Sequence, residues 1–141
     1  TIAVRDKKIY TASLEDSALE VMKDMNKYAY TYIPIIESGR LVGVFSENTV
    51  FSYIVHTGNL SLEKGMKIRE FAEFIPINKH ESESFEFVSK GTLVIDIEEM
   101  FAKELKQGKR LAVVFITANG DPKEKLLGLV TAWDVAGYRE D

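Results

Sequence analysis

The residues best suited to chemistry follow directly after an apolar strand near the carboxyl end of the chain. The stretch "LLGLVTAWDV", residues 126–135, is apolar through Val130 and then gives Thr131 and, three residues later, Asp134. Side-chain oxygens at this spacing can cap a helix, because they accept hydrogen bonds from amides that lack partners within the helix. A carboxylate at the end of a strand can also accept hydrogen bonds from the two vicinal hydroxyls of a ribose. Capping and ligand binding therefore both remain open for Asp134.

A second stretch has nearly the same layout. "RLVGVFSENTVF", residues 40–51, gives an apolar strand followed by Ser46 and, three residues later, Thr49. Ser46 can cap a helix, but Thr49 cannot act as a charged, bidentate acceptor. We therefore expect any site in this copy to be weaker or empty. The recurrence of the layout, with Gly43 and Gly128 inside the two strands, indicates an internal repeat.

The segments around these stretches follow one order of elements, which is strand, helix, hairpin, helix. In the first copy, Ser13 and Asp16 form a capping-box-like helix start, and a hairpin over 31–46 precedes a helix over 47–56. The second copy repeats this order from Phe85 onward. The stretches 58–71 and 78–84 are polar or contain glycine, so we interpret them as a linker and a mobile loop.

We expect an α+β fold of two pseudo-symmetric β-α-β-β-α repeats packed through their sheets. The length of 141 residues and the hydrophobic content of 45% suit one compact module. The first repeat spans residues 1–65 and the second spans residues 66–141. Because Thr1 is not an initiator methionine and the last helix is cut short at Asp141, we also expect a part of a longer chain.

The composition argues against several classes of function. The net charge is -4, with basic residues scattered among acidic ones, so we expect no nucleic-acid partner. No apolar run is long enough to span a membrane, and we expect a cytoplasmic location. There is no cysteine, and we place the two histidines, His56 and His80, at the surface or at helix ends, so we expect no metal site. Nothing pairs a base with a nucleophile, so we expect neither an enzyme nor a required cofactor.

These elements and motifs resemble the CBS domain, which usually occurs as a tandem pair called a Bateman module. The family motif is a strand with a central glycine, followed by Thr or Ser and, three residues later, Asp. "LLGLVTAWDV" matches it fully, whereas "LVGVFSENTV" has Thr49 where Asp is expected. The hydrophobic-Pro-hydrophobic element of the family's second strand appears as "YIPII" around Pro34, and the second copy lacks that proline.

The resemblance implies binding rather than turnover. CBS pairs hold adenosyl compounds, such as AMP, ADP, ATP or S-adenosylmethionine, in clefts between the repeats and alter a fused or partner protein. An adenine nucleotide or related small molecule is therefore the expected regulatory ligand. The alternative is a ligand-free scaffold, a homodimer formed through apolar helix faces that contain Val50, Phe51, Ile54, Val55, Ala132, Val135 and Ala136.

The resemblance also implies which residues contact the ligand. In the second copy, Asp134 would accept the ribose hydroxyls and an apolar slot would hold the adenine. The candidate contacts of this copy are Thr131, Asp134, Trp133, Val113, Val114, Ile75 and Pro76. The candidates for a second, weaker site in the first copy are Ser46, Thr49, Ile33, Pro34 and Tyr10. The apolar members of both sets also suit a core, and Trp133 also suits a subunit contact.

Overall fold

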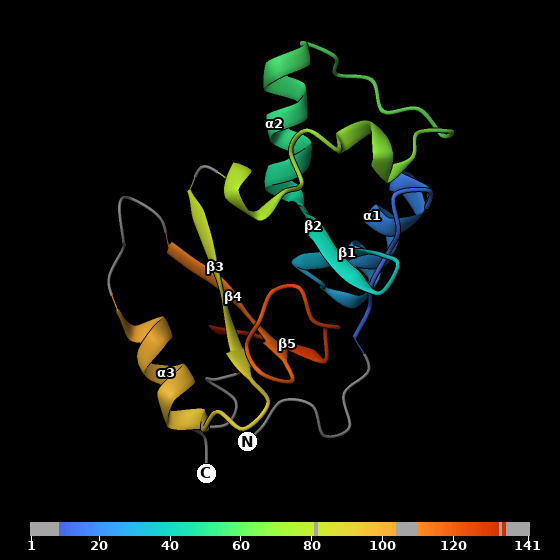
Figure 1. Ribbon diagram of the computed structural model, residues 1–141. Helices are drawn as coiled ribbons and strands as arrows, with labels where there is room; N and C mark the ends of the chain where they lie inside the picture. Colours follow the sequence, from blue (N-terminus) through green and yellow to red (C-terminus); the bar gives the residue numbers. More distant parts are fainter. Residues whose placement is uncertain (1–8, 81, 104–109, 133, 135–141) are drawn as a thin grey trace. The chain divides into compact units, whose positions relative to one another are not determined.

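The computed structural model describes residues 9–80, 82–103, 110–132 and 134 (Figure 1). The chain divides into two compact units: an N-terminal unit, Tyr10–His80, and a C-terminal unit that combines Glu81–Asp141 with Thr1–Ile9. In the described part of the chain, no helix is both long and apolar enough to cross a membrane.

The sheet of the N-terminal unit is a hairpin with one further bridge. β1 (Tyr32–Glu37) pairs antiparallel with β2 (Arg40–Ser46), and Ala12 adds a parallel bridge to β1. The hairpin turn places Ser38 at φ 53° and Gly39 at φ 80°. Two successive left-handed residues define a type I′ turn, whose twist matches that of the paired strands. The predicted hairpin with glycine in its turn is therefore confirmed.

Two helices flank this hairpin in sequence. α1 (Ala18–Tyr28) begins after Ser17, whose side chain accepts a hydrogen bond from a first-turn amide. The predicted start at Ser13 is wrong, because the Ser13 amide donates to the Asp16 carboxylate at 2.9 Å and closes a turn that precedes the helix. α2 (Glu47–Thr57) starts directly at the end of β2, as predicted.

The core of the N-terminal unit contains residues that the sequence placed in a linker. Met66, Ile68, Phe71 and Ile75 are at most 7% exposed and cluster with buried residues of α1 and of the hairpin. The interpretation of residues 58–71 as a linker is therefore wrong for Met66 to Phe71, because these side chains fill part of the core.

The same packing extends the N-terminal unit beyond the expected end of the first repeat at residue 65. Two short 3-10 helices, η1 (Ile68–Phe71) and η2 (Ile77–Lys79), follow that position, and the compact unit ends at His80. His80 is 4% exposed, and its Nε2 lies 3.3 Å from a carbonyl oxygen. His80 is therefore a buried residue at a helix end, where it caps η2, whereas His56 is exposed, and the predicted surface or helix-end placement holds for both.

The packing around β2 explains why residue 43, in the middle of the strand, is a glycine. A Cβ at this position would lie 2.4 Å from the carbonyl oxygen of Ile75, which is too close for any side chain. The same carbonyl accepts a hydrogen bond from the Val44 amide at 2.8 Å. The segment that contains Ile75 therefore crosses β2 in direct backbone contact, and glycine is required there.

The C-terminal unit is built around a three-stranded sheet. β3 (Glu83–Ser89) pairs parallel with β4 (Arg110–Thr117), which pairs antiparallel with β5 (Gly128–Thr131), and α3 (Val94–Ala102) connects the two parallel strands. Since β3 already begins at Glu83, the mobile loop expected over 78–84 is wrong at its carboxyl end.

Each unit therefore has the same local topology, and the predicted repeat is confirmed for its strand, helix and hairpin, whereas most of the closing helix expected in the second copy lies outside the described residues. In the N-terminal unit, Ala12, α1, β1 and β2 follow one another, and the Ala12 bridge to β1 is parallel. In the C-terminal unit, β3, α3, β4 and β5 stand in the same order, with the same parallel and antiparallel pairings.

Candidate functional site

The junction after β5 holds the two polar residues that the sequence singled out. The backbone amide of Thr131 donates to Asp134 Oδ2 at 2.9 Å, and the Thr131 hydroxyl donates to the same oxygen at 3.1 Å. Both residues are half-buried. Asp134 therefore accepts from the Thr131 amide as the third helical residue of a capping box does, whereas the Thr131 hydroxyl, expected to accept from a helix amide, donates to the carboxylate. The carboxylate is thus fixed at the carboxyl end of the strand.

The corresponding junction after β2 is closed. The Ser46 amide donates to Thr49 Oγ1 at 3.0 Å, and the Thr49 hydroxyl donates to the carbonyl oxygen of Val44 at 3.3 Å. Ser46 is 2% exposed and Thr49 is 1% exposed. The Thr49 hydroxyl is thus hydrogen-bonded to backbone groups and is buried away from solvent.

The strand register separates the two valines predicted to line the adenine slot. Val113 is the cross-strand partner of Thr131, so the two side chains lie on the same face of the sheet. Val114 points to the other face, where it is fully buried in a cluster with Ile97 and Ile116. Of the two valines, only Val113 lies on the same face of the sheet as Thr131.

The face of Val113 also carries aromatic residues that the sequence reasoning missed. Phe85 of β3 pairs with Val113, and the rings of Phe85 and Phe87 lie 6.0 Å and 5.3 Å from that of Phe115, which is fully buried. The alternation in "FEFVS" was the available signal, because alternate strand residues share a face. An apolar, aromatic surface therefore lies beside Thr131.

The remaining candidates of the second copy lie elsewhere in the chain. Ile75 and Pro76 belong to the N-terminal unit, where Ile75 is 2% exposed and Pro76 is half-buried. Trp133, Val135 and Ala136 fall outside the described residues. The structure thus brings Val113, Thr131 and Asp134 together.

The candidates of the first copy are distributed over several contacts. Ile33 is fully buried in the core, and Pro34 is buried on the neighbouring position of β1. The hydroxyl of Tyr10 donates to Asp24 Oδ2 of α1 at 2.5 Å. Burial and the hydrogen-bonded carboxylate raise the pKa of Tyr10 to about 12. Ser46 and Thr49 lie at one junction, whereas the Tyr10 hydroxyl is hydrogen-bonded to α1.

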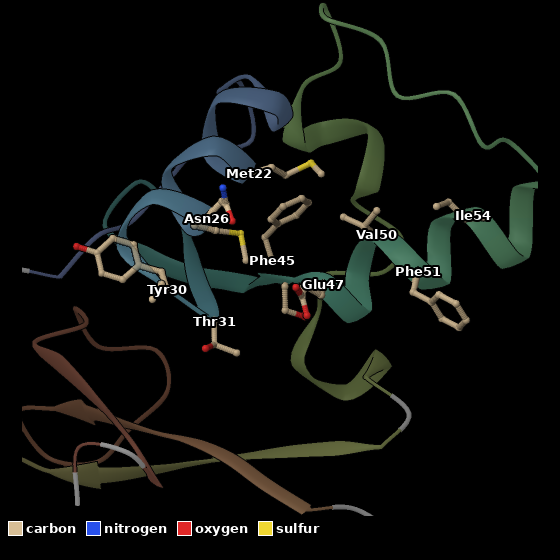
Figure 2. Close-up of a pocket in the computed structure, with 12 residues that line it drawn as sticks. Met22, Asn26, Tyr30, Thr31, Phe45, Glu47, Val50, Phe51 and Ile54 are labelled. Carbon is tan, nitrogen blue, oxygen red and sulfur yellow. The ribbon is translucent and has the colours of Figure 1, made fainter. Parts of the chain in front are cut away.

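A pocket of about 620 Å³ opens within the N-terminal unit (Figure 2). Figure 2 shows Tyr30 and Thr31 on one side, the α2 side chains on the other, and Phe45 between them. The α1 side of the lining consists of Met22, Met25, Asn26, Ala29, Tyr30 and Thr31. The β2 and α2 side consists of Phe45, Ser46, Glu47, Val50, Phe51 and Ile54. Of the residues proposed from the sequence for the first-copy site, only Ser46 lines this pocket.

Residues 3–56 match the family model of the CBS domain. Solved structures over nearly the whole chain have the same fold, and they are CBS-domain proteins. This chain has the fold of a CBS-domain pair. A comparison with curated protein sequences finds no significant match.

Three structures illustrate the likeness of this chain to known proteins. A signal-transduction protein with CBS domains from Burkholderia ambifaria MC40-6 has a TM-score of 0.63 and 14% identity, over 94% of this chain and 83% of that chain. The CBS-domain pair of protein MJ0100, in complex with 5′-methylthioadenosine and S-adenosyl-L-methionine, has a TM-score of 0.61 and 17% identity, over 96% and 91%. CBSX2 in complex with AMP has a TM-score of 0.60 and 17% identity, over 93% and 87%. At these identities the likeness establishes the fold.

Proposed function

We propose that this CBS-domain pair is a regulatory module without catalytic activity that binds an adenosyl ligand and thereby alters a fused or partner protein. Two CBS-domain structures of the same fold hold such ligands, since MJ0100 contains S-adenosyl-L-methionine and CBSX2 contains AMP. The observation that carries the proposal is the half-buried Asp134 carboxylate at the end of β5, held by two hydrogen bonds from Thr131. Binding then changes the partner through a difference in affinity between two arrangements of the module.

The chemistry of this junction suits an adenosine. A carboxylate can accept hydrogen bonds from the 2′ and 3′ hydroxyls of a ribose, and the cap fixes its orientation in advance. Phe85 and Phe87 are half-buried on the sheet face that also carries the fully buried Val113, and their rings suit a flat purine ring. At the position that corresponds to Asp134, the first copy has Thr49, which carries no carboxylate and is enclosed.

The proposal is tested by a thermal-shift titration of the protein with AMP, ADP, ATP and S-adenosylmethionine. A ligand at a hundred times its dissociation constant stabilises the folded state by about 2.7 kcal/mol. We expect one of these ligands to raise the melting temperature, and Asp134→Thr to remove that increase. This substitution copies the first junction into the second, so a side-chain oxygen remains available as a cap while the carboxylate is lost.

Asp96→Thr provides the matched control, since Asp96 is an exposed carboxylate in α3 of the same unit. Its ligand-induced shift should equal that of the wild type. An adenosyl shift that survives Asp134→Thr would move the site away from this junction. The absence of a shift with all four ligands at millimolar concentration would contradict the sensor function.

A second function, a homodimeric scaffold, is favoured by one observation. Phe51 is 66% exposed and Val55 is 60% exposed on the surface of α2, and large exposed apolar side chains that adjoin one another commonly mark interaction sites. If α2 forms the subunit contact, Val55→Lys should convert a dimer into a monomer in light-scattering measurements. A wild-type protein that is already monomeric would exclude this function.

A further inference from the structure

The pocket beside α1 and α2 is lined by residues of the N-terminal unit alone. It lies entirely within the N-terminal unit, and its volume of about 620 Å³ is in the range of sites for small organic molecules. Neither Asp134 nor the aromatic surface of β3 and β4 contributes to it. The pocket is therefore formed without any residue of the Thr131–Asp134 junction.

The walls of the pocket are held in place by contacts outside it. Phe45 is fully buried and packs edge-on against Phe71, with ring centroids 5.3 Å apart. Tyr30 packs against Tyr10 at 5.2 Å, and Tyr10 is in turn bound to Asp24 of α1. A pocket whose aromatic walls are fixed in advance loses little conformational entropy when a ligand binds.

The hydrogen bonds at the end of α1 fix the same wall from the backbone. Ala29 adopts the left-handed conformation at φ 59°, and the Tyr30 amide donates to the Met25 carbonyl oxygen at 3.0 Å. This turn directs the chain from the helix to Tyr30 and Thr31, which Figure 2 shows at the side of the pocket. The hollow is thus a built feature of the unit.

The charges of the lining select the class of ligand. Glu47 carries the only formal charge among the lining residues, all of which belong to the described part of the chain. It lies in the first turn of α2, where it offsets the positive end of the helix dipole that would otherwise attract an anion. The other polar side chains that reach the pocket, such as Asn26 and Thr31, are neutral. A phosphate or carboxylate would meet repulsion here, whereas a cation would be attracted.

The apolar part of the lining favours the same class. Tyr30, Phe45 and Phe51 belong to the lining, and Figure 2 shows Phe45 in the middle with the other two at opposite ends. Aromatic faces attract organic cations as well as apolar groups. Methionine side chains of α1 complete the wall with polarisable surface. The combination of aromatic walls with a single carboxylate complements a molecule that has an apolar body and one positive charge.

We propose that the pocket beside α1 and α2 binds a small organic cation, with the apolar body against Phe45 and the ammonium group near Glu47. Its lining shares no residue with the Thr131–Asp134 junction, and its carboxylate favours a positively charged group. This site gives the N-terminal unit a binding function of its own, although its Ser46–Thr49 junction is closed.

Three probes of nearly equal shape test the proposal: phenethylamine, the neutral 2-phenylethanol and the anion 3-phenylpropionate. Binding is measured by titration of the amide resonances of Tyr30, Thr31 and Val50 in the labelled full-length chain. We expect phenethylamine to bind about threefold to tenfold more tightly than 2-phenylethanol, and 3-phenylpropionate to bind most weakly. Because the probes contain no adenosine, the outcome is independent of the adenosyl function.

Glu47→Gln should reduce the affinity for phenethylamine to that for 2-phenylethanol and leave the alcohol unchanged. Glu47 is exposed, so the substitution does not disturb the core. Glu63→Gln, at an exposed carboxylate outside the pocket, is the matched control and should keep the preference for the amine. Equal affinities for the amine and the anion in the wild type would overturn the proposal.

A second copy of the chain is the competing occupant, because the exposed side of α2 adjoins the pocket. Val55 does not line the pocket, so Val55→Lys weakens a contact between copies without altering the lining. Binding of phenethylamine to the Val55→Lys monomer with the charge preference intact supports the ligand site. Failure of the amine to bind both the wild type and this monomer overturns it.

Discussion

The two strand-to-helix junctions use the same hydrogen bond and differ in what they leave accessible. In both, the residue that ends the strand donates its amide to the side chain three residues later, Ser46 to Thr49 at 3.0 Å and Thr131 to Asp134 at 2.9 Å. Thr49 is 1% exposed, whereas Asp134 is half-buried. The shared part of the motif is therefore explained by capping, and a role in ligand binding depends on the accessible carboxylate of the second copy.

Thr49→Asp is the strongest way to break this comparison, because it gives the first junction the sequence of the second. We expect it to lower the free energy of unfolding by roughly 2 to 4 kcal/mol, since a carboxylate would replace a buried hydroxyl. Urea denaturation measures the loss. The reciprocal change, Asp134→Thr, should cost about 1 kcal/mol or less, the contribution of a cap.

The pair of variants distinguishes two explanations of the closed junction. If burial is the cause, Thr49→Asp destabilises the protein and no second equivalent of adenosyl ligand binds. A Thr49→Asp protein that keeps its stability and binds a second equivalent would show that the missing carboxylate, and not the enclosure, closes the first copy.

Gly43→Ala tests the packing that encloses the first junction. The added Cβ would lie 2.4 Å from the Ile75 carbonyl oxygen, so either β2 or the crossing segment must move. We expect a loss of about 1 to 3 kcal/mol in the free energy of unfolding, as for other overpacked sites. Gly65→Ala is the control, because its Cβ meets nothing within 4 Å and its stability should match the wild type.

The result also bears on the comparison of the junctions. If the crossing segment of Ile75 is what encloses Ser46 and Thr49, Gly43→Ala should increase hydrogen exchange at their amides as well as lowering stability. Unchanged exchange at these amides, together with a lower stability, would mean that the enclosure has another origin.

The sequence was sufficient to predict the elements that local patterns determine. Two apolar runs identified β1 and β2, and glycine identified their turn. The three-residue spacing from Ser46 to Thr49 and from Thr131 to Asp134 identified both junctions. These features depend on residues within a few positions of one another, so the chain itself encodes them directly.

Features that depend on distant segments were missed for a physical reason. Met66, Ile68 and Phe71 lie in a stretch whose polar neighbours and glycine are typical of a linker, yet they are buried against α1 and the hairpin. The pocket beside α1 and α2 joins residues from 22 to 54, and no local pattern brings them together. In contrast, the opposite orientation of Val113 and Val114 follows from strand alternation and was predictable.

The connections between the paired strands offer a further comparison of the two copies. β1 and β2 are joined by the type I′ turn at Ser38 and Gly39, whereas the longer connection between β4 and β5 is held by Glu124. The amide of Asn119 donates to Glu124 Oε1 and its side-chain nitrogen donates to Oε2, both at 2.8 Å. Backbone and side-chain hydrogen bonds from Asn119 lower the pKa of Glu124 from 4.5 to about 2.

The Glu124 carboxylate should make the unfolding free energy depend on pH. We expect this effect to be smaller than those of Thr49→Asp and Gly43→Ala. Because the pKa is lower in the folded state, the stabilisation is present above pH 4.5 and is lost as the pH falls toward about 2. Glu124→Gln should remove that dependence, so its unfolding free energy approaches that of the wild type as the pH falls through this range. Solvent access keeps the contribution modest. If the two curves stay parallel between these pH values, the ionised carboxylate does not hold the loop, and the difference between the two connections is one of length alone.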